Sequence, residues 1–584
     1  MSPSVSELED IQIPLVDQPA YTPNKLRVVT IGAGYSGLIF AHKIQHEQPD
    51  LQDFIEHTIF EANDGVGGTW KVNTYPGVQN DVPAHLYGLP FDPNKNWSRF
   101  YADGDEILEY IERICDKWNL RRDIKFNHRV TALEWIEEDA KWKITLSEKG
   151  EERQEFADFI ISAQGFLSRW KWPKIDGIFD YKGHKVHSAS WDHSFDYSHK
   201  RIGVIGNGSS AVQILPQMAK LEGVDVVSFQ RNPTWITQSL GQTLGVSAGE
   251  PEPPDENDDV GVDMSEVDQD DKTVGSNFNP TYTARDKQRF EDPEKHREYR
   301  RMLQHGMNRG FKLFVKGSIQ NQKSTEATIE RMRKALNYDE DLCKKLIPDW
   351  TLGCRRLTPG EGYLESFLLP HVKLTQSHIK SIDATGINTQ DGQHYDLDVI
   401  VCATGFDVSN IPHYPVTGRG GMTLAEKWKD EPESYLSLAC PDFPNYFIFM
   451  GPNATVGHGT LTTAMDWTAQ YMLKWLRKAA GEQIRSIAPK QSATDEFVRY
   501  GDEIHKTLTW TGSCVSWYKN HRRDGRVTAT WPGSALLYKQ VISELRPEDW
   551  EIEYHSRNRF RFMGNGFTLR EQDEEADLAW YIER

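Results

Sequence analysis

The stretch Leu26-Arg-Val-Val-Thr-Ile-Gly32-Ala-Gly34-Tyr-Ser-Gly37 decides the fold of this 584-residue chain. An apolar run from Leu26 to Ile31 predicts a buried strand, and three glycines with the spacing GxGxxG follow it directly. Gly32 permits a tight turn, and Gly34 lets the backbone approach a pyrophosphate at the N-terminus of the next helix. Gly37 lets that helix pack closely on the strand. Strand, turn and helix in this order are typical of a dinucleotide-binding unit.

A second copy of the pattern stands further along the chain. The apolar run 202–205 is followed by Gly206-Asn-Gly208-Ser-Ser-Ala211, in which alanine replaces the third glycine. Two such units predict two dinucleotides held close together, with electrons passing between them. The residues expected at the second dinucleotide are Gly206, Asn207, Gly208, Ser209 and Ser210.

The residues that follow the next strand make the two units different. The strand predicted over 57–60 ends at Glu61, roughly where a carboxylate that binds a ribose hydroxyl is expected, about 20 residues after the glycines. The strand predicted over 224–229 is followed instead by Arg231 and Asn232. A guanidinium suits a 2′-phosphate, which an acid would repel. The sequence therefore predicts FAD in the first unit and NADPH in the second.

An internal echo predicts how the two units are connected. Residues 158–166 (DFIISAQGF) resemble residues 398–406 (DVIVCATGF), and both are patterns of a buried strand that ends in a glycine turn. Such a segment commonly marks the passage between two nucleotide domains, so we expect an α/β protein with the second Rossmann-like domain inserted in the first. The predicted parts are an N-terminal arm (1–25), an FAD-binding domain (26–175 and 391–584), an NADPH-binding domain (176–236 and 350–390) and a small helical subdomain (237–349) with an acidic loop (249–271).

Composition excludes several classes of protein. The net charge of −19, without a long Lys/Arg cluster, argues against nucleic acid and against an anionic membrane surface. No apolar run is long enough to span a bilayer, and the N-terminus has no secretory signal pattern. The six cysteines are scattered without a CxxC, which predicts neither a zinc site nor a local dithiol pair. A reducing, cytoplasmic compartment is expected.

Two longer motifs carry a family resemblance. The first is Gly67-Gly-Thr-Trp followed by Tyr75-Pro-Gly-Val-Gln-Asn-Asp81, and the second is Tyr181-Lys-Gly-His-Lys-Val-His187-Ser-Ala-Ser-Trp191-Asp. With them the chain resembles the flavin-dependent Baeyer–Villiger monooxygenases, close to the fungal members, over nearly its whole length. Tyr181 stands where this family usually has Phe. Related flavin monooxygenases that oxidise nitrogen or sulfur usually carry Tyr in place of the Trp at 191.

The resemblance implies roles for individual residues. Arg356 matches an arginine held over the flavin, where it stabilises a peroxyanion and then the oxyanion of the ketone adduct, and Asp81 matches the acid that fixes this arginine. His187 is expected to act at a hinge between domains rather than as a base, and Trp517 either lies near NADP or only packs. Flavin contacts are implied at Gly68, Thr69, Trp70, Asp81, Tyr87 and Val130, beside Gly32, Gly34, Gly37 and Glu61. NADP contacts are implied at Gln79, Asn80, Arg355, Arg356 and Trp517, beside Arg231, Asn232 and the second glycine motif.

The function that follows is an FAD- and NADPH-dependent monooxygenase that inserts one atom of O2 next to a ketone carbonyl. The product would be an ester or lactone, and the fungal resemblance favours a bulky secondary metabolite as substrate. The alternatives are a flavin monooxygenase that oxidises nitrogen or sulfur and a redox-inert nucleotide-binding scaffold. A disulfide reductase has the same two-nucleotide plan but needs a dithiol that this chain does not encode locally. No metal is expected, and the oligomeric state is open.

Overall fold

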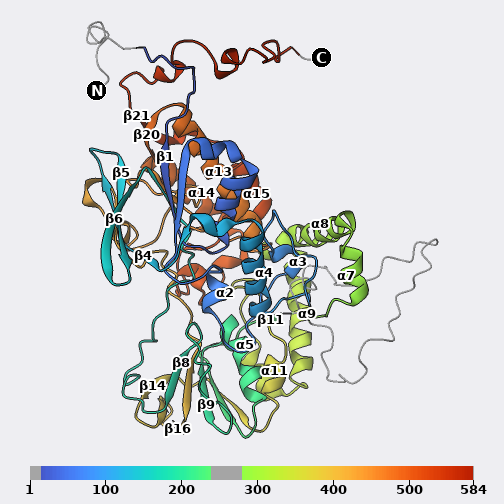
Figure 1. The fold of residues 1–584 in the computed structure, drawn as a ribbon. Helices are drawn as coiled ribbons and strands as arrows, with labels where there is room; N and C mark the ends of the chain where they lie inside the picture. Colours follow the sequence, from blue (N-terminus) through green and yellow to red (C-terminus); the bar gives the residue numbers. More distant parts are fainter. Residues whose placement is uncertain (1–14, 238–278, 583–584) are drawn as a thin grey trace, which may run out of the picture.

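Two parallel sheets organise the chain, whose computed structural model describes residues 15–237 and 279–582 (Figure 1). The first has the order β19-β7-β1-β2-β3 and the second the order β13-β10-β9-β17-β8. The strands of the first sheet are β1 (Leu26–Ile31), β2 (Ile55–Phe60), β3 (Ile124–Lys125), β7 (Phe159–Ser162) and β19 (Tyr446–Ile448). Those of the second are β8 (His184–His187), β9 (Arg201–Ile205), β10 (Asp225–Phe229), β13 (Val372–Thr375) and β17 (Val399–Cys402). The predicted α/β class with two Rossmann-like domains is confirmed.

Both glycine motifs lie in the turn between a buried strand and a helix. The first connects β1 to α1 (Tyr35–His42), and the second connects β9 to α5 (Ser209–Ala219). Gly32 has a φ of +106°, and a Cβ at this residue would lie 2.7 Å from the carbonyl oxygen of Ala163. A Cβ at Gly37 would lie 2.1 Å from the carbonyl oxygen of Gly32. Both positions therefore require glycine for steric reasons.

The two similar segments, 158–166 and 398–406, each contribute one strand, β7 to the first sheet and β17 to the second. Asp158, just before β7, accepts a hydrogen bond from the backbone N–H of Arg27 at 2.7 Å, next to the start of β1. Asp398, just before β17, accepts from the backbone N–H of Arg201 at 2.9 Å and also binds its guanidinium. The chain thus leaves the first sheet after β7 and returns to it after β17, which confirms the insertion.

One domain boundary differs from the sequence prediction. Residues 391–402 were assigned to the FAD-binding domain, but β17 pairs with β8 and β9 of the second sheet. β17 is a fully buried apolar strand, and the side chain of Asp398 just before it accepts the backbone N–H of Arg201 at the start of β9. The return to the first domain therefore follows β17 rather than preceding it.

A helical layer lies beside the two sheets (Figure 1). Its helices are α7 (Ala284–Phe290), α8 (Pro293–Arg309), α9 (Ile319–Ala335) and α10 (Glu340–Leu346). Each begins at a polar residue whose side chain accepts backbone N–H bonds, which is the usual N-cap chemistry; these residues are Thr283, Asp292, Ser318 and Asp339. The acidic loop 249–271 lies outside the described residues.

Smaller elements complete the two domains. An antiparallel sheet on the first domain contains β4 (His128–Ile136), β5 (Lys141–Glu148), β6 (Glu151–Ala157) and β18 (Val416–Thr417), and one on the second contains β14 (Ile379–Ile382), β15 (Gly386–Thr389) and β16 (His394–Asp396). The remaining strands are β11 (Ile236–Thr237), β12 (Thr358–Pro359), β20 (Ile484–Pro489) and β21 (Trp550–Tyr554). The other α-helices among the described residues are α2 (Thr69–Val72), α3 (Ala84–Tyr87), α4 (Gly104–Lys117), α11 (Tyr363–Ser366), α12 (Leu424–Lys427), α13 (Leu461–Gly481), α14 (Gln491–Lys506) and α15 (Ala535–Val541). Within residues 15–237 and 279–582, none of the helices is long and apolar enough to cross a membrane.

Candidate active site between the two nucleotide-binding units

An ion pair joins the two units at the centre of the candidate site. Arg356 donates from Nε to Oδ2 of Asp81 at 2.7 Å and from Nη2 to Oδ1 at 2.6 Å. This is the bidentate geometry in which a guanidinium binds a carboxylate most specifically. Burial disfavours the charge of Arg356, but the Asp81 carboxylate outweighs it and raises the pKa of the guanidinium above its ordinary value. The structure therefore brings together the two residues predicted to be catalytic, which are far apart in the sequence.

The loop that carries Asp81 also contacts the second glycine unit. Tyr75 donates its hydroxyl hydrogen to Oε1 of Gln213 in α5 at 2.8 Å. Gln213 in turn donates from Nε2 to the carbonyl oxygen of Gln79 at 3.0 Å. Gly77 has a φ of +80°, and a Cβ at this residue would lie 2.9 Å from the backbone oxygen of Gln213. The Pro-Gly turn is thus needed for the close approach of the loop to α5.

The first glycine motif forms a shallow backbone cradle with the second loop. A Cβ at Gly68, which has a φ of +53°, would lie 3.1 Å from the Cα of Gly34. No side chain caps the N-terminus of α1 at Gly34. The cradle and the N-terminus of the helix therefore fit a pyrophosphate, which binds helix N-termini through N–H groups and the helix dipole.

The carboxylate of Glu61 accepts backbone hydrogen bonds next to this cradle. Its Oε2 accepts the backbone N–H of Ala33 at 2.8 Å, and its Oε1 accepts the N–H of Asn63 at 2.8 Å. The side-chain amide of Asn63 donates a third hydrogen bond, to Oε1 at 2.8 Å. A carboxylate offers about four acceptor sites, so about one remains for a ribose hydroxyl. Glu61 is buried and lies beside the glycine turn, as a ribose ligand would. Its direct contact with a ribose stays a prediction.

Three aromatic side chains of the first unit contact one another. Trp70 donates its indole N–H to the hydroxyl oxygen of Tyr87 at 3.1 Å, and the two rings meet edge to face at 5.5 Å. Tyr87 also meets Tyr35 edge to face at 5.4 Å. Burial raises the pKa of the Tyr87 hydroxyl, and the charges of Asp81 and Arg356 also act on it. Val130 and Thr69 come from β4 and α2 of the same domain.

The side chain of Asn80 is the clearest sign of a missing polar ligand. It is 4% exposed, and neither its amide nitrogen nor its amide oxygen has a hydrogen-bond partner within the described part of the chain. Leaving a buried polar group without a partner costs about 1–3 kcal/mol. The orphaned amide therefore fits a flat ring with polar edges, such as a flavin or a nicotinamide.

The second glycine unit carries a concentration of positive charge. Arg231 and Asn232 are exposed directly after β10, and Asn207 donates its side-chain N–H to the carbonyl oxygen of Asn232. Arg355 has a lowered pKa because it is buried and because Arg231 repels it. Two neighbouring guanidinium groups favour an anion between them, which fits a 2′-phosphate. A Cβ at Gly208 would meet nothing within 4 Å, so the N-terminus of α5 is open.

Trp517 packs on the first connection between the domains. Its ring stacks on Phe166 at 5.7 Å with an interplanar angle of 22°. The sequence left open whether Trp517 lies near NADP or only packs. The structure shows packing against Phe166, and the contact with NADP stays a prediction.

His187 contacts both connections between the domains. Its imidazole stacks on Trp170 at 4.4 Å, and its Nε2 lies 3.4 Å from the hydroxyl oxygen of Thr404. Its Nδ1 accepts the backbone N–H of Ala189 at 3.1 Å. His187 is fully buried, and burial lowers its pKa to about 4. The geometry supports the expected hinge or positioning role.

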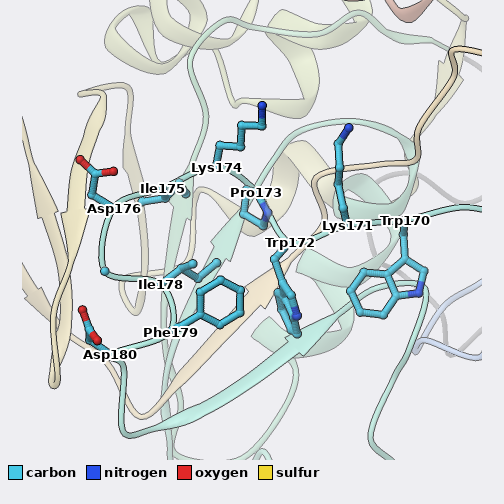
Figure 2. Close-up of a pocket in the computed structure, with 11 residues that line it drawn as sticks. Trp170, Lys171, Trp172, Pro173, Lys174, Ile175, Asp176, Ile178, Phe179 and Asp180 are labelled. Atoms are coloured by element: carbon cyan, nitrogen blue, oxygen red, sulfur yellow. The ribbon is translucent and has the colours of Figure 1, made fainter. Parts of the chain in front are cut away.

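A surface pocket next to this hinge is distinct from the candidate active site. It has a volume of about 880 Å³, and all of its lining residues belong to the loop 170–180 (Figure 2). Lys185 of β8 lies over the rings of Trp172 and Phe179, at 4.9 and 4.6 Å from their centres. The pocket lacks the ion pair and the glycine cradles, so it carries none of the expected chemistry.

A disulfide bond between Cys354 and Cys514 was missed by the sequence analysis. The two residues are 160 positions apart, and their Cα atoms are separated by 6.2 Å. Cysteine spacing indicates local motifs and gives no signal for so distant a pair. The only available hint was their place beside the Arg355-Arg356 and Trp517 segments. The other four cysteines are buried and free.

Comparisons with known proteins also indicate a flavin-binding monooxygenase. The family described as flavin-binding monooxygenase-like matches residues 25–243. The FAD-binding monooxygenase tazF of Aspergillus terreus is 41% identical over 567 residues, which cover 97% of this chain and 96% of tazF. A Baeyer–Villiger monooxygenase of Pseudomonas aeruginosa is 29% identical and covers 89% of this chain and 90% of its own length. The structure of an oxidised steroid monooxygenase bound to NADP is similar with a TM-score of 0.71 and 26% identity, over 91% of this chain and 100% of the other.

The buried His187 predicts a specific dependence of stability on pH. The pKa of this imidazole is about 4 in the folded protein and about 6.5 when unfolded, so only the unfolded chain takes up the proton between these values. Stability is therefore lost as the pH falls through this window. In His187→Asn, the loss of unfolding free energy between pH 7 and pH 5 should be smaller by about 2 kcal/mol.

Denaturant unfolding at the two pH values measures this difference. Substitution of the exposed His193 by Asn is the matched control and should leave the pH dependence of the parent protein unchanged. An equal pH dependence in His187→Asn and the parent protein would contradict the prediction.

Proposed function

Because this chain belongs to the flavin-binding monooxygenases, we propose that it is an FAD- and NADPH-dependent Baeyer–Villiger monooxygenase. It would insert one atom of O2 next to a ketone carbonyl and give an ester or a lactone. The observation that carries the proposal is the ion pair of Arg356 and Asp81 between the two glycine cradles. A bulky secondary metabolite as the ketone is a further part of the proposal. The Cys354–Cys514 disulfide argues against the reducing, cytoplasmic compartment expected from the sequence.

The residues present fit both nucleotides. When bound, the flavin would take electrons from NADPH and supply the activated oxygen atom. FAD would be held by Gly32, Gly34, Gly37, Glu61, Gly68, Thr69, Trp70, Asp81, Tyr87 and Val130. NADP would be held by Gln79, Asn80, Gly206, Asn207, Gly208, Ser209, Ser210, Arg231, Asn232, Arg355, Arg356 and Trp517.

Arg356 supplies the hydrogen bonds that the reaction needs. A guanidinium has five N–H groups, and two of those on Arg356 bind Asp81. The others can donate to negative charge that develops on the carbonyl oxygen of the ketone. One preorganised donor of this kind contributes about 2.7–4 kcal/mol to the stability of a transition state. Asp81 keeps the guanidinium in place and balances its charge, which lowers the cost of its burial.

Arg231 and Arg355 supply the preference for NADPH over NADH. The two cations repel each other, and a 2′-phosphate between them would remove this repulsion. The phosphate would therefore be bound by charge from two separate segments, 231–232 and 353–357.

Product identification separates this proposal from its rivals. The purified enzyme is supplied with NADPH, O2 and panels of cyclic and polycyclic ketones, amines and thioethers, and products are identified by mass. Esters or lactones from ketones support the proposal. Oxygen transfer only to nitrogen or sulfur would make the protein a heteroatom-oxidising enzyme, and a bound flavin that NADPH does not bleach under anaerobic conditions would make it a redox-inert scaffold.

Replacement of Arg356 by Ala should separate the two half-reactions. The variant loses the donor to the carbonyl oxygen, so ester formation should fall by about 10²–10³-fold. Anaerobic bleaching of the flavin by NADPH should persist in part, because the first glycine unit and Arg231 are unchanged although one NADP contact is lost. Stopped-flow absorbance and product mass measure the two steps, and robust ester formation by the variant would refute the role of Arg356.

Replacement of Arg231 by Ala should raise the KM for NADPH far more than the KM for NADH. The variant loses a cation at the proposed 2′-phosphate site, and NADH has no phosphate there. Steady-state kinetics with both nucleotides measures the ratio, and Lys220→Ala on the same domain is the control. Equal changes for both nucleotides would contradict the assignment.

A further inference from the structure

The segment 556–582, here called the C-terminal arm, leaves the body of the molecule after β21. In Figure 1 it is the red chain along the top of the molecule, outside the two sheets. Among the described residues, its hydrogen bonds to the rest of the chain go to residues 17–21. Tyr21 donates its backbone N–H to the carbonyl oxygen of Phe562 at 2.8 Å, and the two rings meet at 4.7 Å. The arm is thus held at one edge by a short N-terminal segment.

The C-terminal arm carries large apolar side chains that are exposed to solvent. Phe560 and Phe567 are 60% and 58% exposed, and Trp580 and Tyr581 are 63% and 69% exposed. Four aliphatic side chains of the arm are also more than half exposed, namely Met563, Leu569, Leu578 and Ile582. Apolar side chains gathered on a surface in this way mark an interaction site more often than they occur on a monomer.

Local contacts give the arm a defined shape before any partner binds. Thr568 donates from both its backbone N–H and its hydroxyl to Oε2 of Glu571, at 2.7 and 2.8 Å. Arg570 donates to the carbonyl oxygen of Asp577 at 3.2 Å, and its guanidinium lies 5.2 Å from the centre of the Trp580 ring. A segment that is already ordered loses less conformational entropy when it binds.

The charges of the arm are divided between its two halves. Residues 556–566 contain three bases and no acid, and the bases are Arg557, Arg559 and Arg561. Residues 571–577 contain five acids and no base, and the acids are Glu571, Asp573, Glu574, Glu575 and Asp577. Two such arms laid antiparallel about a two-fold axis place the basic half of each beside the acidic half of the other. The arm is therefore complementary in charge to a second copy of itself, whereas its acidic half would repel an anionic membrane.

The exposed apolar area is comparable with what a stable dimer needs. A fully covered aromatic side chain buries roughly 150–250 Å². At about 60% exposure, the four aromatic side chains of the arm would together bury roughly 400–600 Å². The four aliphatic side chains and the stems of the arginines add to this area. A standard interface buries about 800 Å² on each partner, so the arm is large enough to carry most of one.

We propose that the C-terminal arm is a dimerisation arm, which pairs antiparallel with the same arm of a second copy of this chain. The apolar side chains of the two arms cover one another, and the arginines of one arm lie beside the carboxylates of the other. Because both chains contribute the same surface, the contact closes on itself and the assembly stops at two chains. Neither glycine motif belongs to the arm, so the dimer forms with or without bound nucleotide.

Sedimentation equilibrium of the full-length protein tests the assembly. At chain concentrations up to about 100 µM, where even a Kd of about 10 µM gives mostly dimer, the mass should be twice the 67.0 kDa of one chain. Trp580→Ser combined with Tyr581→Ser should raise the dissociation constant at least 10-fold, because both side chains lose their apolar contact. A parent protein that keeps the mass of one chain throughout would overturn the proposal, as would an unchanged dissociation constant in this variant.

Charge exchange tests which surface the partner contributes. Arg557→Glu with Arg559→Glu makes both halves of the arm acidic, and Glu574→Lys with Glu575→Lys removes most of the acidic half. Each variant alone should dissociate at least 10-fold more readily than the parent protein, because like charges then face each other. An equimolar mixture of the two variants should recover the dimer, since each changed half again faces its opposite charge.

The matched control is Lys373→Glu with Lys380→Glu, which makes the same change of charge at exposed positions of the second domain. This variant should dimerise like the parent protein. Failure of the mixed variants to recover the dimer, with the control unaffected, would show that the arm does not pair with itself and would overturn the proposal.

Flotation with vesicles of phosphatidylcholine tests a membrane as the competing occupant. The dimer covers the aromatic side chains of the arm, so the parent protein should stay with the unbound fraction. Flotation of the parent protein that is lost in Trp580→Ser with Tyr581→Ser would overturn the proposal in favour of a lipid surface.

Discussion

The ion pair of Arg356 and Asp81 is the interaction on which the arrangement of this molecule depends. It connects a loop of the first nucleotide-binding unit to a segment that belongs with the second. A half-buried charge on either side would be costly without its partner, so each unit stabilises the charged residue of the other. The Tyr75–Gln213 bond runs beside the ion pair and joins the same two units. The candidate site therefore exists only where the two units meet.

The connections between the units explain how this meeting is maintained. One connection begins after β7 and the other after β17. The aspartate just before each of these strands accepts a backbone N–H of the strand that leads into the glycine motif of the same sheet. His187 lies between the two connections and contacts Trp170 on one and Thr404 on the other. An uncharged imidazole in this position can support small rotations without breaking a charge pair. Motion of one unit on the other would then change the distance between Arg356 and Asp81, because the two residues belong to different units.

Local patterns in the sequence were sufficient for some features of the structure and gave no information on others. The glycine motifs predicted β1 and its turn because a strand, a positive φ at Gly32 and a helix are specified by neighbouring residues. The pairing of Arg356 with Asp81 came from a family resemblance, since no local rule connects positions so far apart. The boundary at 391 was wrong because pairing of β17 with β9 is a tertiary contact. The Cys354–Cys514 bond depends on a distant contact in the same way.

The groups left without partners show what the protein still needs. The amide of Asn80 lacks a partner within the described residues, and so does the amide nitrogen of Gln230 beside the second glycine motif. Arg355 and Arg231 repel each other a short distance away. Each of these costs free energy in the protein alone, and a dinucleotide that bound them would recover it. The cofactors would therefore contribute to the stability of the interface between the units, and the geometry of Arg356 would depend on their presence as well as on Asp81.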